Sequence, residues 1–339
     1  MAKYKQLEYP KTQVKKAGRL FSSQRGSEQE REEALRIINN WRAAHAYPMQ
    51  IIYTNLKNKA PSNAIVAQRL KRLASITAKL SRFPTMSLST MQDIGGCRII
   101  VDSLSDVYDF VAKVKKSQWK HRFVEEYDYI QFPKADGYRC YHLVYSYRSD
   151  KNQTYNGLLI ETQIRTRYQH LWATAVETMD EIENDSIKIG KGKEQNRDFF
   201  RLASELLRIY EESNYNQDLV RKSIAAKRMK EFEQRSHILA RLAAVRSIEQ
   251  VTNENIWGSD PGYYLLINNA LKQRITIRYY SYKAVDHATE AYDEYEKNKQ
   301  DHEDIVLVST SSLDTLQNAY PNYFTNIGEF VQLIRTFIA

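Results

Sequence analysis

The sequence lacks the cysteine patterns, the long apolar runs and the apolar leader that define several large classes of protein. Only Cys97 and Cys140 occur among 339 residues, and no Cys-x-x-Cys pair is present, which excludes a disulfide framework and a cysteine-based zinc site. No run of about 18 apolar residues occurs, so no transmembrane helix is expected. The first residues, MAKYKQLEYPKTQVKK, contain no apolar core of a secretory signal. We therefore expect a reduced, cytoplasmic protein without a membrane partner.

Internal repeats and low-complexity tracts are also missing, and the composition is that of a folded protein. Hydrophobic residues make up 42% of the chain and charged residues 27%, which argues against intrinsic disorder. The length of 339 residues is enough for two domains at about 100–200 residues each.

The net charge of +9 is spread unevenly along the chain. Residues 1–90 contain 17 Lys/Arg and 5 Asp/Glu, residues 91–185 contain 12 and 15, and residues 186–339 contain 21 of each. A basic segment beside a slightly acidic one suggests an anionic partner such as nucleotide phosphates or RNA. A solvated basic surface that keeps the protein soluble explains the same numbers equally well.

Hydrophobic periodicity predicts an α+β fold with four parts. Residues 1–60 form a basic helical segment, with a helix over 28–42 that Ser27 caps. Residues 61–185 begin with a helix over 62–81 and continue as a β-α-β-β-β-α unit, which implies a mixed sheet covered by helices. Residues 194–255 read as a helical spacer, and residues 260–339 as a small, separate ββαβα module. The segment 187–193, IKIGKGK, is a candidate boundary.

Two acidic residues in the central region stand in unusual places. Asp93 directly precedes a predicted strand, and Glu161 lies inside the apolar strand LLIETQI. A buried, unpaired carboxylate is costly, so Glu161 should face a cleft or a cation. Two such carboxylates suit a Mg²⁺ ion that also binds substrate phosphates, although two ordinary ion-paired acids would look the same.

Cations and one aromatic residue surround these acids in the sequence. Arginines could grip a polyphosphate through bidentate contacts, and on a helix over 62–81 the residues Arg69, Arg72 and Lys79 would share one face. A solvated charged face is the usual explanation for such a helix. Tyr138 follows the turn-forming Gly137, where an aromatic ring can stack on a nucleobase, but one of 24 tyrosines is weak evidence alone.

The order of these motifs is far more specific than any one of them. An R-x-K-x-x-x-S-I-x-x-K-L stretch over 69–80 is followed by D-I-x-G-x-R-I-I-V over 93–101. Y-D-Y-I-x-x-P-K-x-x-G-Y-R-x-x-H then spans 127–142, E-T-Q-I-R-T spans 161–166, and Trp172 and Glu177 follow. Over about residues 45–185 this pattern resembles the RelA/SpoT family of alarmone synthetases, the pyrophosphokinases that make (p)ppGpp.

The resemblance implies a nucleotidyltransferase-like fold and a reaction. These enzymes transfer the β,γ-pyrophosphate of ATP to the 3′-hydroxyl of GDP, GTP or a related nucleotide, and they release AMP. By position in the motifs, Asp93 and Glu161 are the catalytic acids and Mg²⁺ ligands. Binding of ATP and phosphates is implied for Arg69, Lys71, Lys79, Arg98 and Lys134. Binding of the acceptor is implied for Tyr138, Arg139, His142, Gln163 and Arg165.

This sequence departs from the family pattern at three places. Gln68 replaces a common glycine, Cys140 replaces the usual serine after Tyr-Arg, and Thr178 stands where a histidine often follows the glutamate. The metal acids and the stacking tyrosine remain, so we expect synthesis, with the acceptor left open. The family's hydrolase needs a His-Asp dipeptide, which this sequence does not contain, so no alarmone hydrolysis is expected.

Several alternatives stay open from the sequence. The acceptor could be the 3′ CCA end of a tRNA, as in toxic relatives that block translation, which the basic residues 1–90 favour. The chain could also be a nucleotide sensor without activity. The C-terminal module could stabilise the fold or a homo-oligomer, or it could restrain the synthetase until a regulatory ligand or protein binds. For restraint, Tyr292 and Tyr295 would fill a purine site and nearby acids would meet Arg69.

Overall fold

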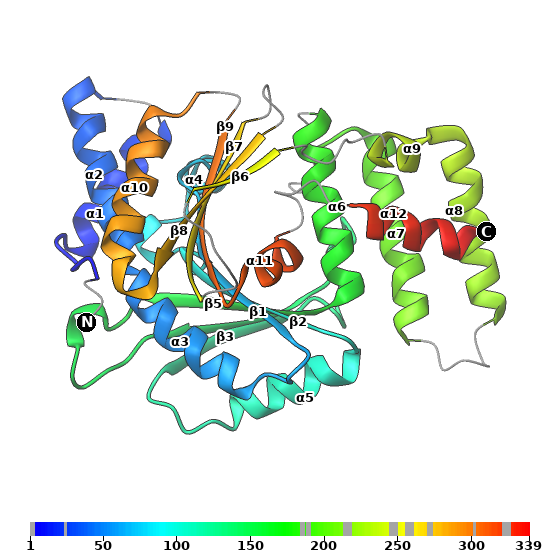
Figure 1. The fold of residues 1–339 in the computed structure, drawn as a ribbon, viewed down its shortest axis with the longest axis horizontal. Helices are drawn as coiled ribbons and strands as arrows, with labels where there is room; N and C mark the ends of the chain where they lie inside the picture. Colours follow the sequence, from blue (N-terminus) through cyan, green and yellow to red (C-terminus); the bar gives the residue numbers. More distant parts are fainter. Residues whose placement is uncertain are drawn as a thin grey trace.

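The computed structural model describes residues 4–23, 26–183, 187, 191–212, 219–243, 250–254, 261–269, 274–300, 303–320 and 327–339. Within these ranges the chain forms a large mixed sheet with helices on both faces and, beside it, a cluster of helices (Figure 1). The predicted α+β class is confirmed. No helix in the described ranges is both long and apolar enough to cross a bilayer.

One sheet contains all the strands of the described residues, in the order β3-β4-β5-β2-β1-β9-β7-β8-β6. β2 pairs with β5, and β6 with β8, in parallel, and the other neighbouring pairs are antiparallel. The strands are β1 Ile65–Leu70, β2 Gly95–Val101, β3 Arg122–Asp128, β4 Tyr141–Ser146, β5 Leu159–Thr166, β6 Gln250–Glu254, β7 Gly262–Asn269, β8 Arg274–Ser281 and β9 Glu303–Thr310.

The predicted separate C-terminal module is wrong, because its strands extend the central sheet. β9 pairs with β1 through Gln68↔Ser309 and Arg69↔Val308. An unpaired strand edge exposes backbone donors and acceptors, and β9 covers that edge of β1. The C-terminal strands therefore belong to the same sheet that holds Arg69, and only a pairing over long sequence distance reveals this.

Helices cover both faces of the sheet. One face packs against α3 Ala46–Lys59, α5 Leu104–Lys115 and α10 Val285–Asn298. On the C-terminal half of the sheet, the short helix α11 Leu313–Ala319 packs on the opposite face. The N-terminal helices α1 Lys11–Ser23 and α2 Glu28–Ala44 pack beside α4 Leu73–Arg82. Ser27 caps α2 as predicted, since its side chain accepts from the Glu30 backbone amide.

The second cluster of helices replaces the predicted spacer. α6 Arg167–Glu183, α7 Glu194–Glu212, α8 Leu219–Ser236, α9 Ile238–Ala243 and α12 Gly328–Ile338 share one buried core. His237 takes a positive φ of 52° and separates α8 from α9; residues 213–218 and 244–249 lie outside the described ranges. Since α12 packs here while β9 joins the sheet, the last 80 residues contribute to both bodies.

The helix predicted over 62–81 is wrong in its first half. Ile65–Leu70 forms β1, which pairs with strands on both sides, and α4 starts only at Leu73. Two flanking partner strands outweigh local helix propensity. The remaining short elements are the 3₁₀ turns η1 Leu88–Thr90, η2 Gln153–Tyr155 and η4 Tyr282–Ala284.

The two tyrosines of α10 pack against other parts of the chain, Tyr292 against α2 and Tyr295 against β8. The Tyr292 ring lies 3.8 Å from the buried Arg42 guanidinium, and Asp293 accepts a 2.8 Å hydrogen bond from the same group. The Tyr295 ring lies under the guanidinium of Arg278. The predicted placement of these tyrosines in a purine site, with acids near Arg69, is therefore wrong, because α10 covers the other face of the sheet.

Candidate active site

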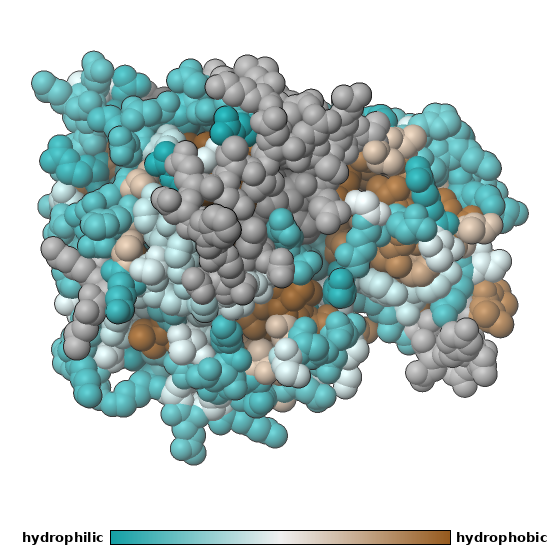
Figure 2. Space-filling view, viewed as in Figure 1, coloured by the Kyte–Doolittle hydropathy of each residue, from teal (hydrophilic) through white to brown (hydrophobic). Residues whose placement is uncertain are grey.

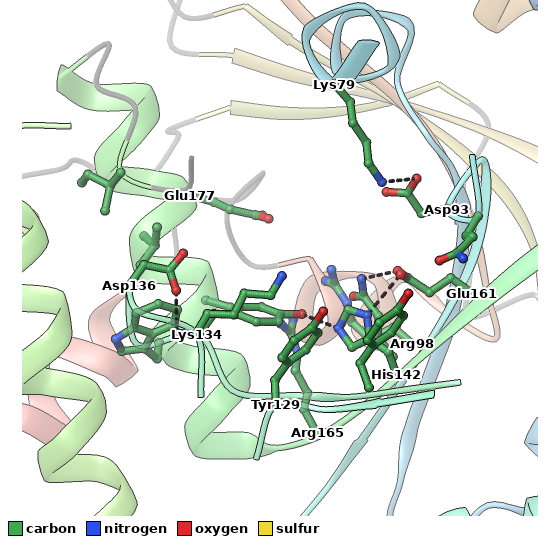
Figure 3. Close-up of a pocket in the computed structure, with 18 of the residues that line it drawn as sticks. Lys79, Asp93, Arg98, Tyr129, Lys134, Asp136, His142, Glu161, Arg165 and Glu177 are labelled. Carbon is green, nitrogen blue, oxygen red and sulfur yellow. Dashed lines mark hydrogen bonds and ion pairs between the residues drawn. The ribbon is translucent and has the colours of Figure 1, made fainter. Parts of the chain in front are cut away.

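A cavity of about 440 Å³ opens between the sheet, α4 and α6 (Figure 3). It gathers most of the residues that the motifs singled out. The predicted residues that line it are Arg69, Lys79, Asp93, Arg98, Lys134, Tyr138, His142, Glu161, Gln163 and Arg165. Lys71 lines an adjoining small cavity that also contacts Asp93, Arg98 and Glu161.

Strand register explains why these side chains meet. Arg69 on β1 stands opposite Gly96 on β2, and Gly96 stands opposite Glu161 on β5. Side chains alternate between faces, so Arg98 and Gln163, which are also opposite each other, point to the same side. His142 on β4 faces Gln163 and completes the row. The alternate residues of β5, such as Ile160 and Ile164, point into the core.

Asp93 is held by two lysines at the start of β2. Lys71 Nζ lies 2.7 Å from one carboxylate oxygen, and Lys79 Nζ lies 2.9 Å from the other (Figure 3). Burial alone would raise the pKa of Asp93, but the two ammonium groups outweigh it and hold this pKa well below its usual range. Burial lowers the pKa of Lys71, and Asp93 opposes this shift. Asp93 is thus an anion at any physiological pH.

Glu161 is fixed by His142 and Gln163. His142 Nδ1 lies 3.1 Å from one Glu161 oxygen, and Gln163 Nε2 donates to the other at 2.8 Å. Burial opposes both charges, yet His142 keeps the pKa of Glu161 below its usual value, and Glu161 with Cys140 raises the pKa of His142 to about 10. His142 is therefore an imidazolium at neutral pH, which donates from both ring nitrogens and cannot act as a general base.

The donor set fits a magnesium ion that shares its coordination with a substrate. Asp93 and Glu161 supply hard carboxylate oxygens on one side of the cavity, and Mg²⁺ is typically bound by one or two carboxylates plus phosphate oxygens and waters. Among the described residues no group of three or more His, Cys, Asp or Glu could hold a metal. The described residues therefore do not form a complete metal site by themselves. Asp93 and Glu161 suit a Mg²⁺ ion whose other ligands are phosphate oxygens and waters.

The loop that joins β3 to β4 presents Tyr138 and Lys134. Gly137 takes a φ of +93°, and a Cβ there would lie 2.9 Å from Ser204 on α7, so glycine is required. Ser204 Oγ donates to the Gly137 carbonyl at 2.6 Å. Tyr138 Oη contacts His142 Nε2 at 2.9 Å. Hydrogen bonds from Ser204 on α7 and with His142 on β4 therefore fix this loop.

Lys134 shows how the aromatic surface of this loop is arranged. Its ammonium group lies 4.3 Å from the centroid of the Tyr129 ring and 5.0 Å from that of Tyr138 (Figure 3). Both contacts are cation–π interactions, worth about 0.5–2 kcal/mol each. A nucleobase that stacks on these rings would share or take the place of this lysine, whose charge could then meet a phosphate.

Arg139 and Arg165, which were predicted to bind the acceptor, form ion-pair or hydrogen-bond contacts with helices beside the sheet. Arg139 does not line the main cavity; it is 3% exposed and pairs with Glu211 of α7, which also accepts from Thr166. The predicted place of Arg139 in the acceptor site is therefore wrong. Arg139 links the sheet to α7 instead, because α7 provides the buried carboxylate of Glu211. Arg165 does line the cavity, but it also contacts His170 on α6.

The sequence reading overlooked several residues that line the cavity. Tyr127 near the end of β3 and Tyr129 just after it have parallel rings, with an interplanar angle of 1° and centroids 5.6 Å apart. Their spacing of two in a predicted strand was the available signal. Phe83 and Met86, just after α4, also line the cavity; these had no recognisable signal, because they follow a helix end.

Tyr320 was also overlooked, and it reaches the site from the C-terminal part. Its ring lies 4.9 Å from the Arg98 guanidinium and 5.7 Å from that of Arg69. Arg98 Nη1 also donates to the carbonyl of Ala319 at 2.9 Å, and the Asn318 carbonyl lies 2.8 Å from His170 Nε2. The end of α11 thus covers the two arginines for which the motifs imply ATP binding.

The central region of the chain is similar to known proteins. The family model described as "Region found in RelA / SpoT proteins" matches residues 68–180. The GTP pyrophosphokinase YjbM of Bacillus subtilis is 37% identical over 111 residues, which cover 32% of this chain and 52% of that protein. The GTP pyrophosphokinase YwaC of the same organism is 36% identical over 111 residues, 31% and 52% respectively. The chain therefore spans about half the length of these curated relatives.

Solved structures give a similar picture. The small alarmone synthetase 1 of Bacillus subtilis, whose structure is described as bound to its product pppGpp, is 25% identical. The aligned part covers 52% of this chain and 92% of that one, with a TM-score of 0.43. Residues 68–180, which include Asp93, Glu161 and Tyr138, are therefore similar to the region found in RelA/SpoT proteins.

Proposed function

We propose that this chain is a pyrophosphokinase that transfers the β,γ-pyrophosphate of Mg-ATP to the 3′-hydroxyl of a nucleotide acceptor and releases AMP. One observation carries the proposal. A single cavity joins the carboxylates of Asp93 and Glu161, a set of cations and an aromatic loop, which are the parts that transfer between two nucleotides needs. Phosphoryl-type transfer depends on positioning and charge neutralisation more than on covalent chemistry. GDP or GTP is the first acceptor to test, because the relatives are GTP pyrophosphokinases.

Each group in the cavity has a defined task in this reaction. Asp93 and Glu161 would hold Mg²⁺, which supplies charge neutralisation on the phosphates when bound. Lys71 and Lys79 lie beside Asp93 and can contact the same phosphates. Glu161, fixed by His142, is placed to orient or deprotonate the acceptor hydroxyl. Tyr138 offers its ring to the acceptor base at about 1–3 kcal/mol for stacking.

A tRNA acceptor is the second candidate, and the number of aromatic rings favours it. A single base needs one or two stacking faces, while Tyr127, Tyr129 and Tyr138 all line the cavity. Successive stacked bases on aromatic side chains are typical of single-stranded nucleic acid sites. In addition, Lys15 and Lys16 are exposed on α1, which packs against α4, and such residues suit an RNA backbone.

We also propose that the C-terminal part restrains the reaction, at Tyr320 rather than at the α10 tyrosines. The Tyr320 ring lies on Arg98 and near Arg69, so ATP must compete with it for the same guanidinium groups. The α10 tyrosines have no such position, since Tyr292 packs on Arg42. Full activity then requires that residues 318–320 move away, which a regulatory ligand or protein could bring about.

A labelled-ATP assay tests the proposal directly. The full-length protein is incubated with Mg²⁺ and ATP labelled in the β- or γ-phosphate, together with GDP, GTP, ATP or deacylated tRNA. Formation of AMP with label in GDP or GTP is the expected result, and label in tRNA alone would select the second candidate. Tyr320→Ala protein is assayed in parallel, so that restraint does not hide activity. Absence of AMP with every acceptor, in both proteins, would refute the proposal and favour a nucleotide sensor without activity.

A further inference from the structure

The lysine pair on Asp93 has a consequence for metal binding. Lys71 reaches Asp93 from the end of β1 and Lys79 from α4, and each takes a different carboxylate oxygen at 2.7 and 2.9 Å. All three side chains are shielded, with exposed fractions of 17% for Lys71, 29% for Lys79 and 19% for Asp93. Both oxygens that a metal ion would use are therefore paired with ammonium groups.

We propose that Lys71 and Lys79 act as a lock on the metal site, which keeps a free divalent cation off Asp93 until the phosphates of ATP draw the two lysines away. This inference rests on the proposed function, since it concerns the Mg-ATP site of that reaction. It assigns the lysines a role as positioning residues that couple metal binding to nucleotide binding. It goes beyond the phosphate contacts that their place in the motifs implies.

The charge balance of the free site supports the lock. One carboxylate faces two ammonium groups, so a divalent ion at Asp93 would meet a local net charge of +1. Glu161 is not part of this cluster of ion pairs; its two oxygens contact His142 and Gln163. Arg69 and Arg98 add further positive charge to the same small cavity. Repulsion between charges a few ångströms apart is strong in a shielded site.

Nucleotide phosphates reverse this balance. A triphosphate carries about four negative charges at neutral pH, which exceed the single charge of Asp93 as a partner for two lysines. Once the lysines contact phosphate oxygens, the Asp93 oxygens are free, and Mg²⁺ can bind between carboxylates and phosphates, the arrangement that it prefers. The same two lysines therefore exclude the metal from the free protein and strengthen the site when ATP is present.

Binding of Mn²⁺ to the nucleotide-free, full-length protein tests the lock. Free Mn²⁺ is counted by electron paramagnetic resonance for the wild type, Lys71→Met, Lys79→Met and the double variant. We expect binding to tighten about tenfold for each single variant and further in the double variant, as removal of one nearby charge predicts. Lys113→Met is the matched control, because Lys113 lies on α5 and contacts the Lys59 carbonyl; it should leave Mn²⁺ binding unchanged.

Two further measurements separate the lock from a structural effect. The affinity for a non-hydrolysable ATP analogue in EDTA should fall in the same methionine variants, so that metal and nucleotide affinities change in opposite directions. Asp93→Asn added to the double variant should remove the gain in Mn²⁺ binding. Lys71→Arg and Lys79→Arg retain the charge and should bind Mn²⁺ as the wild type does. If a methionine variant fails to fold, the glutamine variant takes its place.

The proposal is overturned if folded methionine or glutamine variants bind Mn²⁺ no tighter than the wild type. It is equally overturned if the tighter Mn²⁺ binding of the double variant persists when Asp93→Asn is added. Neither result depends on turnover, because no step of the measurement forms AMP. Failure of the lock and failure of the proposed pyrophosphoryl transfer are therefore distinguished by the Mn²⁺ titration and the labelled-ATP assay.

Discussion

The two sides of the cavity are built from different parts of the chain. The proposed acceptor side comes from β3, β4 and the loop between them, with α7 behind it. The proposed ATP side comes from β1, β2 and α4, and there Tyr320 of the C-terminal part lies on Arg98. Figure 1 shows α11 between the sheet and α6, next to this side. The proposed ATP side is therefore contacted from outside the matched residues 68–180, while the proposed acceptor side is formed largely within them.

In Figure 2 hydrophobic side chains gather in patches between the sheet and the helical cluster, within a largely hydrophilic surface. The helical cluster fixes the acceptor loop through Ser204 and Arg139. A truncation near residue 193 would remove α7 and these contacts together, so it would damage the acceptor side at the same time as it freed the ATP side. Single substitutions separate the two effects more cleanly.

The largest effect is expected from the acids that the two sides share. Asp93→Asn and Glu161→Gln should each lower the rate of pyrophosphate transfer by about a thousandfold, as loss of a charge-stabilising group in a transfer site does. The rate of AMP formation measures this. Melting temperatures close to that of the wild type would show that the fold is intact. Near-normal transfer by both folded variants would contradict the assigned metal site.

Tyr320→Ala should change the ATP side alone. Loss of a shielded cation–π contact, worth about 2 kcal/mol, should improve ATP affinity by about thirtyfold and leave acceptor affinity unchanged. Equilibrium binding of a non-hydrolysable ATP analogue gives the first number, and acceptor KM gives the second. Tyr320→Phe keeps the ring over Arg98 and serves as the control. Equal ATP affinity in all three proteins would show that the tyrosine does not compete with ATP.

Tyr138→Ala should change the acceptor side alone. Loss of one stacking face should raise the acceptor KM by about tenfold, which corresponds to 1–2 kcal/mol, with ATP binding retained. Tyr127→Ala distinguishes the acceptors, because a second stacking ring matters for a nucleic acid end and little for a mononucleotide. Initial rates against GTP and against tRNA show which holds. A larger effect on ATP binding than on the acceptor would break the division between the two sides.

The smallest effect concerns pH and His142. Its pKa is raised from 6.5 to about 10 in the folded protein, so the stability it contributes is fully present below pH 6.5 and is lost as pH rises toward 10. Between pH 7 and 9, His142→Gln should therefore lose less stability than the wild type, by on the order of 1 kcal/mol. Urea unfolding at the two pH values measures the difference. Parallel pH profiles for both proteins would argue against an imidazolium at this position.

Most of the candidate site could be predicted from the sequence, because its members lie in ordered motifs on predicted strands. Glu161 and Gln163 share a strand face, as the alternation predicts, and both line the cavity. Arg69 shows the limit: it was assigned to a helix, yet it lies on β1. The motif still identified it, because a motif records spacing and residue type whatever the local structure. For Arg139 the motif predicted the wrong contact, since its partner Glu211 lies 72 residues away in the sequence.

What the sequence determined by itself was local: the α+β class, the capped helix after Ser27, the glycine turn before Tyr138, and the two acids that precede or occupy strands. These depend on neighbouring residues and on side-chain alternation, which the chain states directly. Only the tertiary structure decided that β9 extends the sheet beside β1, that Tyr292 packs on Arg42, and that Tyr320 reaches Arg98. Such contacts join residues more than 200 positions apart, and their free energy comes from burial and pairing that no local pattern encodes.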